Sequence, residues 1–427
     1  AASDRENRPH GPALPSAPVS GDFFHVVSLD EATLRCSQLP PVGTEHVELS
    51  EAAGRVLAQD VESPIDLPGF RRSTMDGYAV RAASTFGASE SASAVLDVVG
   101  AVDMGACADV RVGPGQAVRI LTGGMLPPDA DAVVMVEHTQ PLDDATIEVT
   151  RGVAPKQNVV EANEDLARGE TLLYRGSRLR PQEIGLLAAI GAAEVHVFQR
   201  PVVAILSTGD EVVPVSADPR PGQVRDVNSS TLGAMVRAAG AIPRPLGIVG
   251  DEFALLLAIA RAALETADTL IISGGSSVGT RDLTIEVLSA LADSEILAHG
   301  VAIRPGKPTI LARVGSKAVW GLPGHVASAI VVFHVLVGPF VERLGGLARR
   351  PPLALGVARL SRNVPSVHGR RDFVRVRLED RGGEVWAVPL LGKSALLRTM
   401  VESDGLIEID ADEEGLDEGA LVQVRRW

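Results

Sequence analysis

The sequence predicts a multidomain α/β protein whose central domain is a three-layer α/β/α arrangement around a parallel sheet. Between residues 201 and 345, short apolar runs alternate with longer segments of helical periodicity, which is typical of a sheet covered on both faces. Two of these runs end in small, hydroxyl and glycine residues with carboxylates beside them. In a parallel sheet such strand ends meet at one edge, where ligands bind.

Size and composition limit the class of protein. With 427 residues the chain is too long for one hydrophobic core, and roughly three domains are expected. The net charge of -14 and the 3% of aromatic residues argue against a nucleic-acid partner, which needs a basic face and stacking platforms. The cysteines, Cys36 and Cys107, have neither disulfide nor metal-ligand spacing. No apolar run is suited to cross a bilayer and no leader-like segment opens the sequence, so we expect a cytoplasmic protein without a membrane partner.

The first residues predict a tail followed by a discontinuous domain. Residues 1–22 are rich in Pro, Ala, Ser and charge, which predicts disorder. Residues 23–65 and 154–199 together predict a helical linker domain. Ser28 or Asp30 is expected to cap its first helix and Ser50 its second, and the later segment is expected to return to helix.

Three further domains follow from changes in hydrophobic pattern. Residues 66–153 alternate apolar and polar side chains between Gly and Pro turns, which predicts a β-rich domain. Residues 200–346 form the α/β domain, and residues 347–427 predict a small C-terminal β-barrel-like domain. In the α/β domain, strands are expected at 202–206, 242–248, 270–272 and 318–320, and helices at 230–239, 253–265, 283–291 and 325–337.

A glycine-rich turn follows the apolar run at 270–272. Residues 273–279 are Ser-Gly-Gly-Ser-Ser-Val-Gly. Glycines let successive amides point into one concavity and the following helix adds its positive end, so this turn suits a phosphate or another oxyanion. The spacing is neither a dinucleotide fingerprint nor a P-loop. A strand-to-helix turn without a ligand is the alternative.

Several carboxylates are expected at the same sheet edge. Asp210 and Glu211 follow the strand at 202–206, Asp251 follows the next strand, and Asp282 lies just beyond the glycine turn. Acids that converge beside an anion-binding turn suit a divalent cation, most naturally Mg²⁺ bridging to phosphate. Helix N-capping is the alternative for Asp251 and Asp282 taken singly.

Cationic and isolated positions add further candidates. Arg304 and Lys307, held between two prolines, suit a tetrahedral oxyanion, although an ordinary surface turn is the alternative. His325 follows the turn at 321–324, and a structural role there is the alternative to ligand contact. Asp76 lies in a tight loop of another domain, and composition alone favours a solvated turn residue there.

Together these motifs resemble the MoeA family of molybdopterin molybdenumtransferases, which is related to the E domain of gephyrin. The similarity extends from about residue 23 to the C-terminus. The markers occur in the family's order: DLPGF at 66–70, STMDGYAVR at 73–81, RILTGG at 119–124, ADAVVMVE at 130–137, STGDE at 207–211, GQVRDVNS at 222–229, SGGSSVGTRD at 273–282, RPGKP at 304–308 and GLPG at 321–324.

The resemblance implies four domains per subunit, with a MogA-like molybdopterin-binding domain at the centre, and a head-to-tail homodimer. It implies a site between the central domain of one subunit and the Asp76-bearing domain of the other. The implied enzyme inserts molybdate into adenylylated molybdopterin with Mg²⁺-dependent hydrolysis of the adenylate. Its products would be molybdenum cofactor and AMP.

The resemblance also implies roles for individual residues. The catalytic acids correspond to Asp76, Glu211, Asp251 and Asp282, and the last three are the expected metal ligands. Molybdate is expected to bind at Arg304, Lys307, Arg370 and Ser394. Substrate contacts are expected at Thr122, Asp165, Ser207, Thr208, Gly209, Ser273, Gly274, Gly275, Ser277, Gly279, Pro323 and Ser328.

This sequence also departs from the family pattern. Ser276 replaces a valine in the glycine turn, Arg304 replaces a lysine, and His325 and Val326 replace the Asn-Pro that usually follows GLPG. A usually basic segment reads Val-Val-Glu-Ala-Asn at 159–163. These changes motivate a rival interpretation, a degenerate paralogue that keeps the dimer and acts as a gephyrin-like scaffold. Retention of all the matched acids weighs against it.

Overall fold

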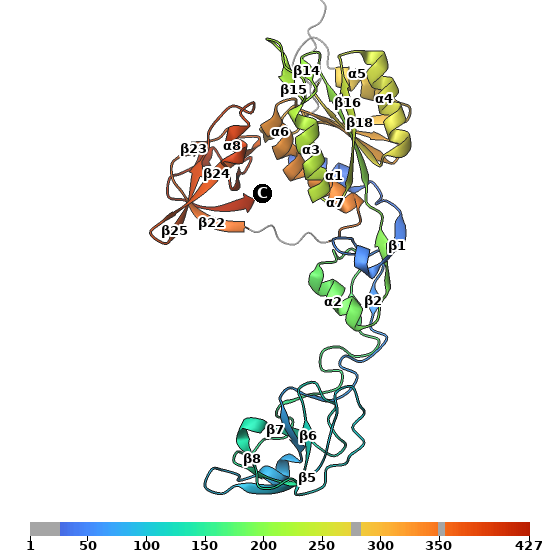
Figure 1. The fold of residues 1–427 in the computed structure, drawn as a ribbon. Coiled ribbons are helices and arrows are strands. Elements are labelled where there is room, and N and C mark those ends of the chain that lie inside the picture. The colour runs from blue at the N-terminus through green and yellow to red at the C-terminus, as the bar shows by residue number, and fades with distance from the viewer. Residues whose placement is uncertain (1–25, 275–282, 349–354) are drawn as a thin grey trace, which may run out of the picture. The chain divides into compact units, whose positions relative to one another are not determined.

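The chain folds into two compact units. The computed structural model describes residues 26–274, 283–348 and 355–427 (Figure 1). The first unit takes its residues from Ala1–Pro40, Pro201–Leu344 and Pro351–Trp427, and the second from Pro41–Arg200 and Gly345–Arg350. The predicted tail at 1–22 lies outside the described residues, and the predicted domain boundaries remain predictions.

A six-stranded sheet forms the centre of the first unit, in the order β16–β13–β17–β21–β20–β18. The first four strands are parallel, as predicted: β16 (Ile242–Val249), β13 (Val202–Thr208), β17 (Thr269–Ser273) and β21 (Lys317–Leu322). The other two run antiparallel to their neighbours: β20 (Ile310–Val314) and β18 (Ser294–His299). A two-residue turn joins β20 to β21, and a turn this short can only connect antiparallel strands.

Helices cover both faces of this sheet (Figure 1). One layer contains α1 (Leu29–Ser37), α3 (Val227–Ala238), α6 (Val326–Val332) and α7 (Gly338–Leu344). The other contains α4 (Phe253–Thr266) and α5 (Leu283–Ser289). The predicted three-layer α/β/α domain is therefore confirmed. The Ser28 hydroxyl accepts a hydrogen bond from the Glu31 N–H and caps α1, as one of the two predicted alternatives had it.

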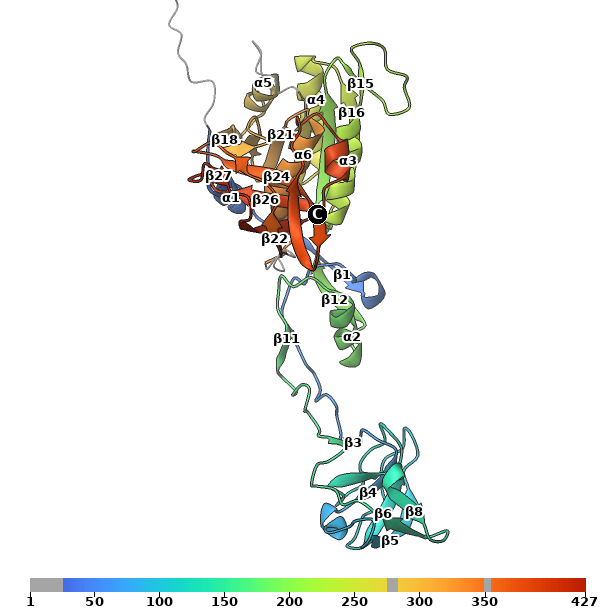
Figure 2. The ribbon, with the colours of Figure 1, turned by 90° about the vertical axis from the view of Figure 1, so that its left-hand side faces the viewer.

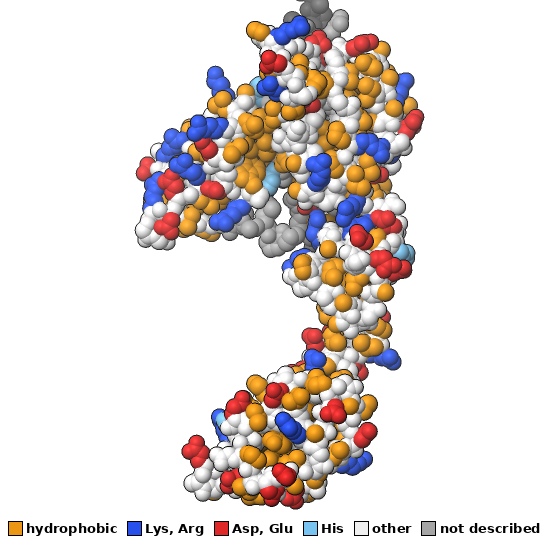
Figure 3. Space-filling view, viewed as in Figure 1, with side chains coloured by type: hydrophobic (Ala, Val, Ile, Leu, Met, Phe, Trp, Pro, Cys, Tyr) orange, Lys and Arg blue, Asp and Glu red, His pale blue; other side chains and the backbone are white. Residues whose placement is uncertain are grey.

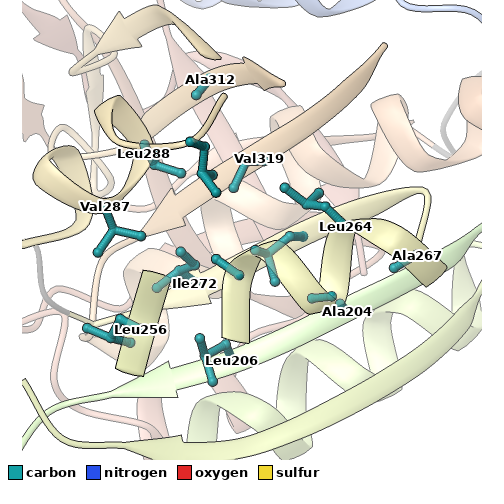
Figure 4. Close-up of a cluster of buried hydrophobic side chains, with 14 of the residues drawn as sticks. Ala204, Leu206, Leu256, Leu264, Ala267, Ile272, Val287, Leu288, Ala312 and Val319 are labelled. Atoms are coloured by element: carbon teal, nitrogen blue, oxygen red, sulfur yellow. The ribbon is translucent and has the colours of Figure 1, made fainter. Parts of the chain in front are cut away.

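Apolar side chains from the sheet and from α4 and α5 make one core (Figure 4). Leu206 and Ile272 lie on neighbouring strands, with Leu256 of α4 and Val287 of α5 in the same cluster. Because helices cover both faces, these strands appear in the sequence as unbroken apolar runs. Each buried side chain of this kind contributes about 1.5–3 kcal/mol by leaving water. The core therefore holds the strand ends, and the residues that follow them, in fixed positions.

The longest apolar helical run belongs to the interior of this domain. Among the described residues, only Val326–Leu344 is long and apolar enough for a membrane span, and 67% of that stretch is buried in the protein. It consists of α6, a π-helical turn η4 (Phe333–Val337) and α7. Phe340 packs on Trp320 of β21 with 5.4 Å between ring centroids. The run is the core helix that the sequence predicts.

A closed five-stranded barrel forms the C-terminal part of the first unit (Figure 1). Pairing of β24 with β26 closes the order β24–β25–β22–β28–β26, which confirms the predicted barrel-like domain. Ile303–Arg304 (β19) adds a short parallel strand to β24 from the α/β domain. The barrel strands are β22 (Leu355–Leu360), β24 (Arg371–Arg381), β25 (Glu384–Pro389), β26 (Gly405–Ile409) and β28 (Leu421–Arg426). The remaining elements are β23 (Val364–Pro365), β27 (Gly415–Leu416) and α8 (Arg398–Val401).

The second unit contains the predicted β-rich domain (Figure 2). Its six-stranded sheet has the order β7–β4–β6–β5–β9–β8. These strands are β4 (Gly77–Val80), β5 (Ala94–Ala101), β6 (Gln116–Ile120), β7 (Ala132–Met135), β8 (Thr139–Pro141) and β9 (Thr146–Val149). Buried Val80, Leu96 and Val134 lie on one face of the sheet, and Ala79, Val118 and Val133 lie in a second cluster. The sheet is thus buried on both sides.

The linker segments of this unit are less helical than predicted. They contain the strand pairs β1 (Thr44–Glu48) with β12 (Glu194–Phe198), β2 (Val61–Glu62) with β11 (Thr171–Leu173), and β3 (Arg72–Ser73) with β10 (Val159–Val160). Their one described α-helix is α2 (Pro181–Ala189).

The predicted second helix, capped by Ser50, is wrong. Ser50 lies in a 3₁₀ turn, η1 (Leu49–Glu51), that directly follows β1, and beyond it Val56 and Leu57 form isolated bridges to Arg178 and Val197 in place of a helix. The side chains of β1 alternate between exposed and half-buried, because β12 pairs along it. Helix α1 also differs from expectation, since it packs on α7 in the first unit.

Candidate active site

The carboxyl ends of β13, β16, β17 and β21 bring several predicted residues together. Ser207, Thr208 and Ser273 are buried at these ends. The hydroxyls of Ser207 and Ser229 lie 2.9 Å apart, which joins β13 to the first turn of α3. Strands of a parallel sheet all end at one edge, so residues separated in sequence become neighbours there.

Hydrogen bonds connect two of the predicted acids, Asp210 and Asp251, to the turns at this edge. The Thr208 hydroxyl donates to Asp251 Oδ1 over 3.0 Å, and the Asp251 N–H donates to Asp210 Oδ1 over 3.0 Å. A Cβ on Gly209, which has φ +139°, would lie 2.7 Å from Glu211 Oε2, so the Glu211 carboxylate is close to this turn. Asp210 thus stabilises the turn by accepting from the Asp251 N–H, while Asp251 and Glu211 are exposed carboxylates beside it.

The predicted metal ligands are only partly within the described residues. Asp282 lies outside them, so the set of Glu211, Asp251 and Asp282 is not seen together. Within the described ranges, no three His, Cys, Asp or Glu side chains gather closely enough to hold a metal ion by themselves. The magnesium site therefore stays a prediction.

The start of the glycine turn packs tightly against β13. Gly274 has φ +109°, and its N–H donates to the Leu322 carbonyl over 3.1 Å. A Cβ at Gly274 would lie 2.2 Å from the Thr208 carbonyl oxygen, so only glycine fits without a backbone shift. The predicted contacts Gly275, Ser277 and Gly279 lie outside the described residues.

Asn228 is a buried residue at this edge that we did not predict. Its Nδ2 donates to Ser273 Oγ over 2.7 Å and to the Gly324 carbonyl over 2.9 Å. It therefore ties the start of α3 to the turns after β17 and β21. Its sequence signals were its place in the marker GQVRDVNS and its position two residues after Asp226, which caps α3.

A pocket of about 700 Å³ lies between the start of α6, the turn after β19 and the C-terminal barrel. Six of the predicted site residues line it: Arg304, Lys307, Pro323, Ser328, Arg370 and Ser394. They come from two domains of the first unit, and β19 joins those domains by pairing with β24. The predicted oxyanion residues are therefore neighbours in the fold.

The pocket contains a carboxylate that the sequence reasoning missed. Asp372 Oδ1 accepts a hydrogen bond from Arg370 Nε over 2.9 Å, and its Oδ2 accepts one from Arg304 Nη1 over 3.4 Å. The Asp372 side chain is only 4% exposed, whereas that of Arg304 is 61% exposed. Nothing in the sequence near Asp372 marks it as the partner of an arginine 68 residues away.

His325, at a position where the chain departs from the family pattern, also belongs to the pocket. Its Nδ1 lies 3.0 Å from the Ser394 hydroxyl. The Ala327 N–H donates to the Ser394 carbonyl over 3.1 Å, so two bonds fasten the barrel segment to the start of α6. Histidine at 325 is thus compatible with an ordered pocket.

The charge of the pocket favours an anion. Five cationic side chains line it against the single carboxylate of Asp372: Arg304, Lys307, Arg370, Arg375 and Lys393. Figure 3 shows basic and acidic side chains interspersed over the visible face of the C-terminal domain. The excess of cations is therefore a property of the pocket. Guanidinium and ammonium groups donate charge-assisted hydrogen bonds to oxyanions.

The predicted residues of the second unit form their own arrangement. The backbone N–H and the hydroxyl of Thr122 donate to Asp76 Oδ1 over 2.7 and 2.8 Å. These bonds, the backbone one first, hold the pKa of Asp76 below its usual range. Asp165 is exposed in the same unit, and its N–H donates to the Leu67 carbonyl over 3.1 Å.

Comparison with known proteins gives matches along nearly the whole chain. The MoeA N-terminal region (domains I and II) matches residues 27–191, a probable molybdopterin-binding domain matches 204–343, and the MoeA C-terminal region (domain IV) matches 357–427. The molybdopterin molybdenumtransferase of Bacillus subtilis is 34% identical over 93% of both chains. That of Haemophilus influenzae is 34% identical over 93% of this chain and 98% of its own.

A solved structure agrees with these sequence matches. The molybdopterin biosynthesis MoeA protein from Pyrococcus horikoshii OT3 is 30% identical and superposes with a TM-score of 0.82. The match covers 94% of this chain and 100% of that one.

Proposed function

The chain belongs to the MoeA family of molybdopterin molybdenumtransferases, and from this premise we propose that it inserts molybdate into adenylylated molybdopterin, with hydrolysis of the adenylate. Water attacks the adenylate phosphorus and the phosphoanhydride bond breaks, which releases AMP. The two thiols of molybdopterin bind the molybdenum, and their protons leave with one molybdate oxygen as water, which gives molybdenum cofactor. The observation that carries this proposal is the cationic pocket, which gathers Arg304, Lys307, Arg370 and Ser394 from distant parts of the sequence.

In this proposal the pocket holds molybdate. Arg304, Lys307 and Arg370 supply positive charge, and the hydroxyls of Ser328 and Ser394 are available as neutral donors. Molybdate carries two negative charges on four oxygens, so several donors arranged around a concave site suit it. The pocket residues bind and orient the oxyanion and leave the hydrolytic step to the sheet edge.

The sheet edge holds the phosphate side of the substrate. The hydroxyls of Ser207, Thr208 and Ser273 lie at the strand ends beside the exposed carboxylates, and the Gly274 N–H, bonded to the Leu322 carbonyl, fixes the start of the glycine turn there. Glu211 and Asp251, together with Asp282, would hold Mg²⁺, and their exposed oxygens fit its preference for hard ligands. When bound, the cation would neutralise charge that develops on the phosphate. One of these carboxylates would also accept a proton from the attacking water.

A second copy of the chain completes the site in this proposal. We propose a head-to-tail homodimer in which Asp76 of the partner subunit approaches the sheet edge. The support is that Asp76 is an exposed, ionised carboxylate already held in position by Thr122. Mixing two inactive variants, Asp76→Asn and Asp251→Asn, should restore activity, because a mixed dimer contains one intact site. Failure of the mixture to recover AMP release would contradict the shared site.

A cytoplasmic location remains part of the proposal. Cys36 is buried and Cys107 is exposed, and both are free thiols. Free thiols persist in a reducing compartment.

The test of the proposed reaction is AMP release by the purified chain supplied with adenylylated molybdopterin, with and without Mg²⁺ and molybdate. We expect release that depends on both ions. Tight substrate binding without AMP release would contradict the enzymatic proposal and point to a damaged oxyanion pocket, and absence of substrate binding would favour the scaffold alternative.

A further inference from the structure

We propose that Asp372 is a positioning residue for the oxyanion pocket, where its buried carboxylate holds the guanidinium groups of Arg304 and Arg370 as a pair. This inference rests on the proposed molybdate site. Arg304 lies on β19 of the α/β domain, Asp372 lies on β24 of the barrel, and Arg370 is the residue before β24. The three side chains therefore come from both domains that line the pocket.

The backbone first brings these side chains together. In the parallel pairing of β19 with β24, Arg304 is the register partner of Asp372, and the Arg371 N–H donates to the Ala302 carbonyl over 2.9 Å. Strand pairing fixes the Cα positions but leaves a long arginine side chain free to choose among many rotamers. A further contact is therefore needed to define where the Arg304 guanidinium lies.

The Asp372 carboxylate supplies that contact. Each of its oxygens accepts one guanidinium hydrogen bond, Oδ1 from Arg370 and Oδ2 from Arg304. With 4% of its side chain exposed, the carboxylate has little water to replace these donors, so losing either arginine would leave a buried charge poorly compensated. The arginines are thus held in place before any anion arrives.

This arrangement favours anion binding in two ways. A guanidinium has five N–H donors. Arg370 donates to Asp372 from its Nε and Arg304 donates to it from its Nη1, so each guanidinium keeps further N–H donors for a ligand. Side chains that are already ordered lose less entropy on binding. The carboxylate also separates the two cations, which lowers their mutual repulsion in the empty pocket.

The same strand offers a matched control. Glu379, further along β24, also lies between two arginines, with Oε1 accepting from Arg377 over 2.6 Å and Oε2 from Arg381 over 2.9 Å. Glu379 does not line the pocket, and its side chain is 32% exposed. Asp372→Asn and Glu379→Gln therefore remove the same charge from similar arginine pairs, one inside the pocket and one outside it.

The experiment is calorimetric titration of the full chain with molybdate alone. We expect Asp372→Asn to weaken molybdate binding about tenfold or more, while Glu379→Gln stays within about twofold of the unchanged protein. Equal affinities for all three proteins, an equal loss in both variants, or no molybdate binding by the unchanged chain would overturn the inference.

Two further variants protect the test against misfolding. If Asp372→Asn is unfolded by circular dichroism, Asp372→Glu keeps the charge and displaces the carboxylate by one methylene, and weaker molybdate binding is again expected. A double-mutant cycle with Arg304→Ala separates positioning from a general structural role. Because Asp372 acts through Arg304 and Arg370, the double variant should lose less affinity than the sum of the two single losses, and fully additive losses would count against the proposal.

Kinetics on the same samples separate this inference from the proposed reaction. Asp372→Asn should raise the molybdate concentration for half-maximal AMP release and leave the maximal rate nearly unchanged. Molybdate binding that depends on Asp372 without any AMP release would refute the reaction and leave the positioning role standing. AMP release by Asp372→Asn with an unchanged molybdate requirement would refute the positioning role and leave the proposed reaction standing.

Discussion

The sheet edge and the neighbouring pocket lie in one unit of the protein, yet their charges have opposite sign. The edge presents Asp210, Glu211 and Asp251 among hydroxyls, whereas five cations line the pocket. The turn between β21 and α6 belongs to both, since the Gly324 carbonyl accepts from Asn228 and His325 contacts Ser394. In the proposed function, phosphate and metal binding would therefore fall to one surface and oxyanion binding to the other, and one short segment connects the two.

The largest effect is expected from a substitution that changes only the acidic sheet edge. Asp251→Asn should lower the rate of AMP release on the order of 100-fold, because metal-assisted charge stabilisation is worth several kcal/mol. Molybdate affinity by calorimetry should not change. The neighbouring exposed acid Glu252, which makes no capping bond at α4, gives the control Glu252→Gln with normal rates. A joint loss of rate and molybdate binding in Asp251→Asn would show that the two surfaces are not separate.

Damage to the cationic side should give the complementary result. Arg304→Ala is expected to weaken molybdate binding roughly tenfold to 100-fold, since a charge-assisted hydrogen bond is worth about 1.5–3 kcal/mol. The rate at saturating molybdate should be nearly retained. Arg313→Ala, which removes an exposed arginine paired with Glu295 outside the pocket, is the matched control. A loss of maximal rate without a change in affinity would contradict the assignment of Arg304.

The contact between His325 and Ser394 tests how the two surfaces are held together. Ser394→Ala removes one neutral hydrogen bond, and we expect molybdate affinity to fall by a few-fold, consistent with about 0.5–1.5 kcal/mol. Because the Ala327 N–H bond to the Ser394 carbonyl remains, the melting temperature should change little. Calorimetry and thermal unfolding on the same sample check both statements, and a large drop in melting temperature with unchanged affinity would assign Ser394 a structural role only.

Asp76 is a carboxylate in a third environment, which differs from that of both surfaces. Thr122→Val removes the hydroxyl bond and keeps the backbone bond, so the pKa of Asp76 should rise towards its ordinary value. A lowered folded-state pKa contributes stability above the unfolded pKa and loses it as pH falls through the folded pKa, so the variant should lose the part of this contribution that the hydroxyl supplies and keep the part from the backbone bond. Carboxyl NMR titration measures the shift, and Thr122→Ser, which restores the hydroxyl, should reverse it. An unchanged pKa of Asp76 in Thr122→Val would show that the Thr122 hydroxyl does not lower that pKa.

Local sequence pattern predicted the four parallel strands and the helices of the α/β domain well, because each of these elements is marked by its own residues, but it missed the antiparallel strands β18 and β20. The apolar run at 202–206 became β13, and the amphipathic segment at 253–265 became α4. The linker segments were predicted poorly. Residues 44–48 have no strong pattern of their own, and their strand conformation depends on pairing with β12, which lies about 150 residues away in the sequence.

The candidate site divides in the same way. Residue type and order alone identified Arg304, Lys307, Glu211 and Asp251, since charge and glycine spacing are properties of the chain itself. Asp372 and Asn228 were found only in the fold, because what distinguishes them is burial against residues far along the chain. A sequence determines which chemical groups a protein has and which short elements they follow. Whether a carboxylate meets water, a metal or two arginines is decided by tertiary packing, which sets the distances and the exclusion of water on which its energy depends.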